Sequence, residues 1–222
     1  MLYLVPTPVG NLGDMTYRAV EVLRGADVIL AEDTRTSRPL LLRYGIDTPM
    51  QSHHIHNEHQ EAARWVEQMK AGRNIAVITD AGTPGISDPG FLIVREAIKE
   101  GVEVECLPGA TAFVPALVQS GLPCDKFVFL GFLPHKKGRH TALAKLADEP
   151  RTTVIYESPH RLAKLLAELQ GSVGGARPCA VCREISKVHA ETFRGTVEEC
   201  LAHFSSKEVR GEIVVVLGGG EG

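Results

Sequence analysis

The stretch IAVITDAGTPGISDPG, residues 75–90, decides the fold class of this 222-residue chain. Residues 75–79 are apolar or β-branched, which is typical of a central strand that is buried on both faces of a parallel sheet. The twelve residues from Thr79 to Gly90 hold three glycines, two prolines and two aspartates. Glycine has no Cβ to keep a ligand off the main chain, and proline fixes a loop in advance. The stretch predicts a strand and then a loop that binds a ligand through its backbone.

Short apolar runs alternate with amphipathic stretches on both sides of this strand, which predicts an α/β fold. In the first half we expect strands at 2–5, 28–31, 75–79 and 102–107, and helices at 14–24, 39–45, 57–71, 88–100 and after 109. In the second half we expect strands at 127–132, two within 180–193 and one at 212–217, and helices at 158–169 and after Thr196. A turn-rich stretch at 119–126 predicts two domains, 1–118 and 119–222.

Composition and charge exclude several classes of protein. Apolar residues make up 44% and charged residues 23%, which is ordinary globular usage and unlike a disordered chain. The longest apolar runs, such as 213–217, are too short to cross a bilayer, so we expect a cytoplasmic protein without a membrane partner. Residues 1–113 carry 10 basic and 15 acidic side chains, net −5, whereas residues 114–222 carry 14 and 12, net +2. A polyanion should therefore meet the second half.

Cys179 and Cys182 form a CxxC motif, which is a candidate for metal or redox chemistry. No second pair has matching zinc spacing, and the surrounding segment is typical of a buried strand. The five cysteines of a chain without a secretory signal are expected to be reduced thiols.

A second group of candidate ligands lies near residue 57. The histidines and acids there favour three interpretations: a metal site, substrate contacts, or a solvated loop at a helix start. The members are His53, His54, His56, Glu58, His59 and Glu61.

Charged residues follow nearly every expected strand. Because the carboxyl ends of strands in an open α/β sheet border the binding crevice, these side chains predict one composite site. Turns alone would not require them. They are Glu32, Asp33, Arg35, Asp80, Asp88, Glu157, Arg161, Arg183 and Glu184. No dinucleotide fingerprint, P-loop or hydrolase motif is complete.

These motifs closely resemble the tetrapyrrole methylase superfamily, and within it the branch that methylates the ribose 2′-hydroxyl of a cytidine in small-subunit ribosomal RNA. The resemblance covers almost the whole chain. Its motifs are 6–12 (PTPVGNL), 31–35 (AEDTR), 79–90, 108–112 (PGATA), 131–134 (GFLP), 157–161 (ESPHR) and 183–187 (REISK). The tetrapyrrole-modifying members have a first loop of the GxGPGD kind, whereas this chain has PTPVGN, which favours the RNA branch.

The resemblance implies an enzyme of two α/β domains, with a mostly parallel sheet covered by helices on both faces in the first and a smaller mixed sheet in the second. It further implies S-adenosylmethionine bound in the cleft between the domains, and a homodimer. The cofactor-binding residues that it implies are Pro8, Asp80, Ala81, Gly82, Thr83, Ile86, Ala110, Thr111, Ala112, Tyr156 and Glu157.

Methyl transfer to a ribose hydroxyl calls for alignment, a base and a cation near the developing alkoxide. The catalytic candidates are Asp33, Glu184, Arg35 and Lys187, with Asp33 or Glu184 as base and a Glu184–Lys187 ion pair as the alternative. The expected contacts to 16S ribosomal RNA of the small subunit are Lys136, Lys137, Arg139, Arg161 and Arg183, with a solvated linker as the alternative for the basic run. Rival functions are C-methylation of a precorrin-like macrocycle and non-catalytic binding of adenosylmethionine.

Overall fold

A computed structural model describes residues 1–53, 55–206 and 208–220. The chain forms two compact units, unit 1 (Met1–Thr111) and unit 2 (Ala112–Gly222). The boundary that the sequence predicts, between residues 118 and 119, falls inside a helix of unit 2, α5 (Phe113–Ser120).

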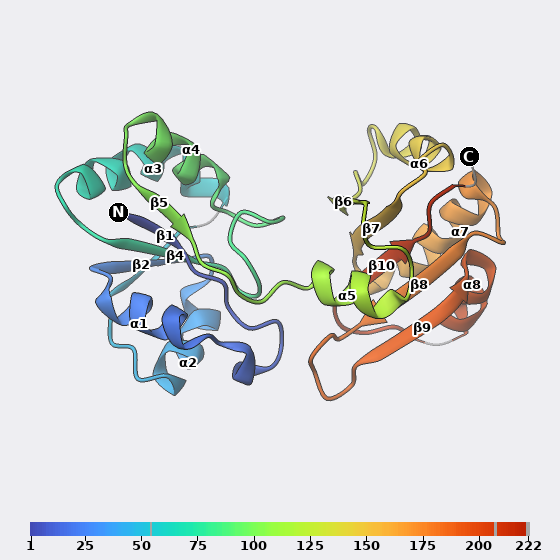
Figure 1. The fold of residues 1–222 in the computed structure, drawn as a ribbon, viewed down its shortest axis with the longest axis horizontal. Coiled ribbons are helices and arrows are strands. Elements are labelled where there is room, and N and C mark those ends of the chain that lie inside the picture. The colour runs from blue at the N-terminus through green and yellow to red at the C-terminus, as the bar shows by residue number, and fades with distance from the viewer. Residues whose placement is uncertain (54, 207, 221–222) are drawn as a thin grey trace. The chain divides into compact units, whose positions relative to one another are not determined.

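Unit 1 is a five-stranded parallel sheet in the order β3-β2-β4-β1-β5 (Figure 1). Helices cover both faces: α1 and α2 pack on one face, and α3 and α4 on the other. The two cores are separate because successive side chains of a strand point to opposite faces. Leu2 and Leu4 pack under α3 and α4, whereas Val5 packs toward α1. The elements are β1 (Leu2–Leu4), η1 (Leu12–Asp14), α1 (Tyr17–Gly25), β2 (Val28–Ala31), α2 (Thr34–Arg43), β3 (Met50–Ser52), α3 (Ile55–Lys70), β4 (Ile75–Ile78), α4 (Phe91–Lys99) and β5 (Val104–Cys106).

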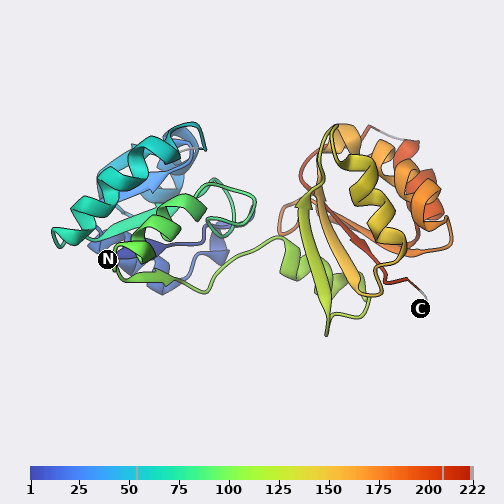
Figure 2. The same cartoon turned by 90° about the horizontal axis from the view of Figure 1, so that it is seen from above.

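Unit 2 holds a mixed sheet in the order β6-β7-β10-β8-β9, in which β10 runs antiparallel to both of its neighbours. Helix α5 packs on one face, and α6, α7 and α8 pack on the other (Figure 2). The elements are α5, β6 (Phe127–Phe132), α6 (Arg139–Ala147), β7 (Thr152–Glu157), η2 (Pro159–Arg161), α7 (Leu162–Val173), β8 (Pro178–Arg183), β9 (Glu191–Thr196), α8 (Val197–Ser205) and β10 (Ile213–Leu217). The predicted fold class is confirmed.

Several boundaries differ from the expected ones. Helix α2 begins directly after Asp33, which caps it, and Pro39 lies inside the helix instead of preceding it. Thr16, not Asp14, caps α1. The capping box of Thr196 and Glu199 at the start of α8 is confirmed.

The CxxC cysteines lie on opposite faces of β8. Cys179 packs in the core under α7 and α8, whereas Cys182 packs against α5. Two residues three apart in a strand point away from each other, so they cannot share one metal ion or form a disulfide with each other. Burial raises the pKa of the Cys182 thiol. The interpretation as a buried strand is correct.

Among the residues that the structure describes, every helix is too short or too polar to cross a bilayer.

Gly109 lies against Pro6, where the chain leaves β5 beside the first loop. A Cβ on Gly109 would lie 2.6 Å from Pro6 Cβ and 2.8 Å from Pro6 Cγ. We expect Gly109→Ala to lower the free energy of unfolding by about 1–3 kcal/mol, because the two loops must separate. Urea denaturation measures this change. Gly25→Ala, where a Cβ meets nothing within 4 Å, is the control. Equal midpoints for Gly109→Ala and the parent would contradict the close approach.

Candidate functional site

Three loops meet at the carboxyl edge of the unit 1 sheet. They are the first loop (residues 6–12), the central loop (79–90) and the PG loop (108–112), whose last residue, Ala112, belongs to unit 2. Thr7 and Gly82 exchange backbone hydrogen bonds of 2.9 Å in both directions, and Thr7 Oγ1 donates to Thr79 O. Thr83 Oγ1 donates to Ala110 O at 3.1 Å. The central loop is therefore fastened to both neighbours.

The central loop turns sharply at four residues with positive φ: Gly82 (92°), Gly85 (84°), Ser87 (66°) and Gly90 (136°). Gly85 N donates to Pro89 O at 3.0 Å, which closes the loop on itself. A Cβ at Gly90 would lie 3.1 Å from Gly85 N, so the two glycines permit a close backbone approach. The glycine-rich motif specifies this conformation.

Three carboxylates gather beside the central loop. Thr79 Oγ1 donates to Glu32 Oε2 at 2.6 Å, and Asp33 N donates to Asp80 Oδ1 at 3.3 Å. Partial desolvation and the nearby charge of Glu32 raise the pKa of Asp80, although this residue keeps contact with solvent. A cationic ligand at this edge would offset that repulsion.

Asp33 and Arg35 form a bidentate ion pair, with Arg35 Nε 3.1 Å from Asp33 Oδ1 and Arg35 Nη2 2.7 Å from Asp33 Oδ2. Asp33 Oδ1 also accepts from the Arg35 amide at 2.8 Å. The hydrogen bonds from Arg35 lower the pKa of Asp33 to about 2. The Arg35 side chain is 89% exposed, so its other face is open to a ligand. Asp33 is thus an ionised hydrogen-bond acceptor and a weak base.

The two other catalytic candidates, Glu184 and Lys187, lie in unit 2 after β8. Lys187 Nζ donates to Glu184 Oε1 at 2.8 Å, and the Glu212 amide donates to the same oxygen at 2.9 Å. Burial acts in the opposite direction, but these hydrogen bonds lower the pKa of Glu184. Lys187 also pairs with Glu212 at 3.0 Å. The ion pair that the sequence offered as the alternative is present, and the structure places Glu184 and Asp33 in different units.

Arg183 closes the loop that follows β8. Its guanidinium donates to Glu191 Oε2, to His189 O and to Arg210 O, each within 3.1 Å. Its side chain is 20% exposed. These contacts hold Arg183 to its own unit, so an RNA contact would use the little of its surface that remains open.

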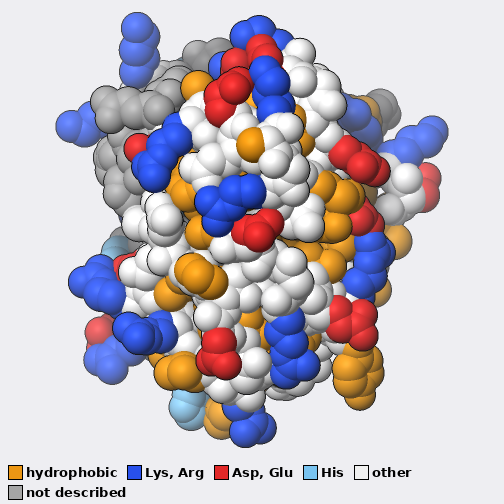
Figure 3. Space-filling model, turned by 90° about the vertical axis from the view of Figure 1, so that its left-hand side faces the viewer, with side chains coloured by type: hydrophobic (Ala, Val, Ile, Leu, Met, Phe, Trp, Pro, Cys, Tyr) orange, Lys and Arg blue, Asp and Glu red, His pale blue; other side chains and the backbone are white. Residues whose placement is uncertain are grey.

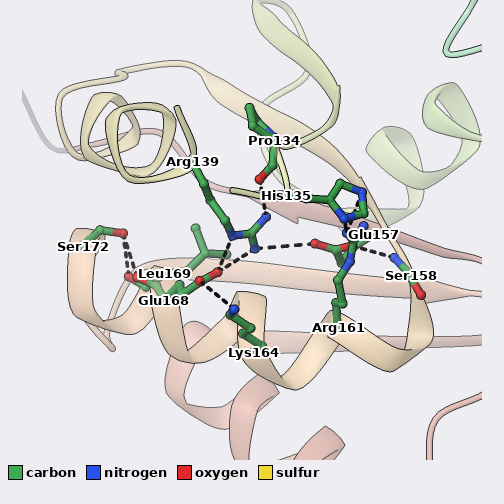
Figure 4. Close-up of polar contacts among 10 residues, drawn as sticks. All are labelled: Pro134, His135, Arg139, Glu157, Ser158, Arg161, Lys164, Glu168, Leu169 and Ser172. Carbon is green, nitrogen blue, oxygen red and sulfur yellow. Dashed lines mark hydrogen bonds and ion pairs between the residues drawn. The ribbon is translucent and has the colours of Figure 1, made fainter. Parts of the chain in front are cut away.

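A buried polar network lies at the carboxyl edge of the unit 2 sheet (Figure 4). Glu157 Oε1 accepts from Ser158 N and Arg161 Nε, both at 2.8 Å. Arg139 binds Glu168 and lies 3.6 Å from Glu157 Oε2. Arg139 is only 7% exposed. It therefore lies inside unit 2, apart from the exposed Lys136 and Lys137 of the same run.

The residues that the resemblance assigns to the cofactor fall in both units. Ile86 is 37% exposed. In unit 2, Tyr156 stands edge-on to Phe129 and Phe132, with ring centroids 5.0 and 5.6 Å away. Pro8 and Gly82 are buried, Ala81, Thr83, Ala110, Thr111, Ala112 and Tyr156 are partly buried, and Asp80 is exposed.

The histidine cluster lies largely outside the described residues. His54 is not described, nor are the side chains of residues 55–60, whereas His53 is buried and Glu61 accepts from Arg64 at 2.9 Å. Within the described part of the chain, no group of three potential metal ligands is found.

Sequence reasoning missed the partners that fix these groups. Glu168 holds Arg139 from 29 residues away, and Thr79 holds Glu32 from 47 residues away. Such pairs carry no local spacing signal. On the side of the molecule that Figure 3 shows, basic and acidic side chains are intermixed.

Two α/β units, each with polar loops at the carboxyl edge of its sheet, define the class of two-domain enzymes that hold a ligand on strand-end loops. A family model described as Tetrapyrrole (Corrin/Porphyrin) Methylases matches residues 1–201. The chain belongs to this family of methyltransferases, whose methyl donor is S-adenosylmethionine.

Curated relatives align over nearly the whole chain. The chain is 47% identical over 220 residues to a Synechocystis protein named "Ribosomal RNA small subunit methyltransferase I", covering 99% of this chain and 79% of that one. A Thermotoga maritima protein of the same name is 44% identical and is covered to 99% in both chains.

Solved structures share the fold at low identity. Cobalt precorrin-4 methyltransferase superposes with a TM-score of 0.70 at 17% identity, covering 98% of this chain and 94% of that one. Uroporphyrin-III C-methyltransferase from Thermus thermophilus, solved with S-adenyl homocysteine, gives 0.65 at 22%, covering 98% and 96%.

Proposed function

We propose that this protein transfers the methyl group of S-adenosylmethionine to the ribose 2′-hydroxyl of a cytidine in 16S ribosomal RNA. The observation that carries the proposal is the identity of 44–47% to relatives named small-subunit ribosomal RNA methyltransferases. The PTPVGN first loop supports the RNA substrate over a macrocycle. The proposal includes a cytoplasmic homodimer that acts on the small subunit.

The residues at the edge of unit 1 fit the methyl donor. A sulfonium cofactor also carries an ammonium group, and the cluster of Glu32, Asp33 and Asp80 supplies negative charge with Asp80 exposed. Ile86 offers an open apolar side chain to an adenine ring. The central and PG loops would hold the cofactor through backbone near Gly82 and Ala110. When bound, it supplies an electrophilic methyl group.

The chain's own residues would orient the acceptor. Asp33 stays ionised at every working pH and can accept a hydrogen bond from the ribose hydroxyl, while Arg35 contacts the adjoining phosphate or ribose. A carboxylate with a pKa of about 2 is a weak general base. Most of the rate of methyl transfer therefore comes from alignment of the hydroxyl oxygen about 3 Å from the methyl carbon. Glu184 and Lys187 remain catalytic candidates, and Arg161 and Arg183 remain candidates for RNA contacts.

The product of the reaction tests the proposal. Incubation with small ribosomal subunits and tritiated S-adenosylmethionine, followed by nuclease digestion and mass spectrometry, should yield a cytidine methylated on its ribose. A methyl group on a base, transfer to a precorrin instead of RNA, or cofactor binding without transfer would each contradict it.

Lys136 and Lys137 are the exposed cations of the basic run, and we propose that they bind RNA phosphates. The double substitution Lys136→Ala, Lys137→Ala is expected to raise KM for small subunits about three- to fivefold and to flatten its salt dependence, because fewer counterions are released. Affinity for the cofactor, measured by calorimetry, should not change. Parental KM and salt slope would show that the run is a solvated linker.

A further inference from the structure

Arg139 ties together three elements of unit 2 beneath the basic run. Its Nε and Nη2 donate to Glu168 Oε2 of α7 at 2.9 and 2.5 Å. Its Nη1 donates to Pro134 O at 3.1 Å, just beyond the end of β6. Its Nη2 also lies 3.6 Å from Glu157 Oε2, at the end of β7 (Figure 4). One guanidinium thus spans a helix, a loop and a strand end.

A second arginine, Arg161, contacts His135, the residue that follows Pro134 in the same loop. Arg161 Nη2 pairs with Glu157 Oε1 at 2.6 Å, and Arg161 Nη1 lies 2.7 Å from His135 Nε2. The Arg139 amide donates back to Lys136 O at 3.2 Å. The turn that carries Lys136 and Lys137 is therefore fastened on both sides by the same network.

The network around this turn depends on Arg139 because of the carboxylate of Glu157. The side chain of Glu157 is fully buried, and within the described chain its Oε2 makes no hydrogen bond. Arg139 supplies the positive charge beside that oxygen. A lysine has a single ammonium group and lacks the planar fork, so it cannot reach Glu168, Pro134 O and Glu157 together.

We propose that Arg139 is a positioning residue for RNA binding: it fixes the turn at 134–138 and thereby sets where Lys136 and Lys137 meet the RNA backbone. The inference rests on the RNA contacts proposed for these two lysines. This role takes the place of the direct RNA contact that the sequence predicts for Arg139, because a buried guanidinium cannot reach an RNA phosphate.

A double-mutant cycle on the whole protein tests the proposal. Arg139→Lys is expected to raise KM for small subunits about three- to fivefold and to flatten the salt slope, with kcat and cofactor affinity unchanged. Adding Arg139→Lys to the Lys136→Ala, Lys137→Ala variant should change KM no further, because the residues that Arg139 positions are gone. Glu168→Gln, which retains Arg139, should give a smaller effect in the same direction and serves if Arg139→Lys folds poorly.

Arg177→Lys is the matched control. Arg177 also binds main-chain carbonyls of unit 2, those of Leu146, Ala147, Glu149 and Gly218, but it does so at the opposite end of α6. It should lower the melting temperature without moving KM for RNA.

Two results would overturn the inference. One is an effect of Arg139→Lys on KM that persists in the variant without the two lysines, and the other is an unchanged KM in folded Arg139→Lys and Glu168→Gln. No effect of the lysine substitutions would overturn the RNA contact itself, and a methylated ribose in the same assay would still support the proposed reaction.

Discussion

Asp33→Asn is expected to slow methyl transfer by about 10²-fold in single-turnover assays on small ribosomal subunits, with cofactor binding retained. The substitution keeps the size of the side chain but removes the charged acceptor that faces the hydroxyl in the proposed reaction. It also weakens the hold on Arg35, because Asn keeps only one of the two oxygens that bind the guanidinium. Between pH 6 and 9 the parental rate should not show the titration of Asp33, because its pKa is about 2.

Unit 2 offers a matched control for this substitution. Glu149 holds Arg151 in the same way, through the Arg151 amide, Nε and Nη2, and these hydrogen bonds likewise lower the pKa of Glu149 to about 2. Glu149→Gln should leave the rate at the parental value. A parental rate for Asp33→Asn would place the group that accepts the hydrogen bond of the ribose hydroxyl elsewhere, with Glu184 next to test, or leave alignment as sufficient.

Ala81→Leu is expected to weaken S-adenosylmethionine binding at least about tenfold in calorimetry, which is about 1.4 kcal/mol. The added carbons extend from the central loop into the space proposed for the ligand. Ala81 is a better position than Gly82, whose φ of 92° would strain any side chain and confuse affinity with folding.

The control exchanges the same two residue types, Leu and Ala, on an exposed helix surface. Leu42 is 66% exposed on α2, and Leu42→Ala should change neither affinity nor folding. If Ala81→Leu binds the cofactor as tightly as the parent while its melting temperature is unchanged, the central loop does not line the cofactor site.

The sequence predicted well where local chemistry determines structure. The β-branched run before Thr79 gave a buried central strand, and Thr196 with Glu199 gave a helix start. Boundaries failed where a side chain has a second, local role. Asp33, a catalytic candidate, also caps α2: its carboxylate accepts from the Arg35 amide two residues further on, and this cap starts the helix before Pro39.

Long-range pairing limited the prediction of the site. Arg139 lies in a basic run, and its sequence neighbours favour a surface role. It is buried because it pairs with Glu168 of α7 and Glu157 of β7. Composition alone could not separate it from Lys136 and Lys137. The candidate carboxylates were correctly placed at strand ends, but their ion pairs decide which of them remain open to a ligand.

The reciprocal hydrogen bonds between Thr7 and Gly82 couple the lengths of two loops that are distant in the sequence. A residue inserted before Thr7 or before Gly82 would shift one strand of this short bridge and break both bonds. Evolutionary change in one loop would then require a compensating change in the other. Grafting the central loop onto a related enzyme should accordingly succeed only when the first loop is transferred with it.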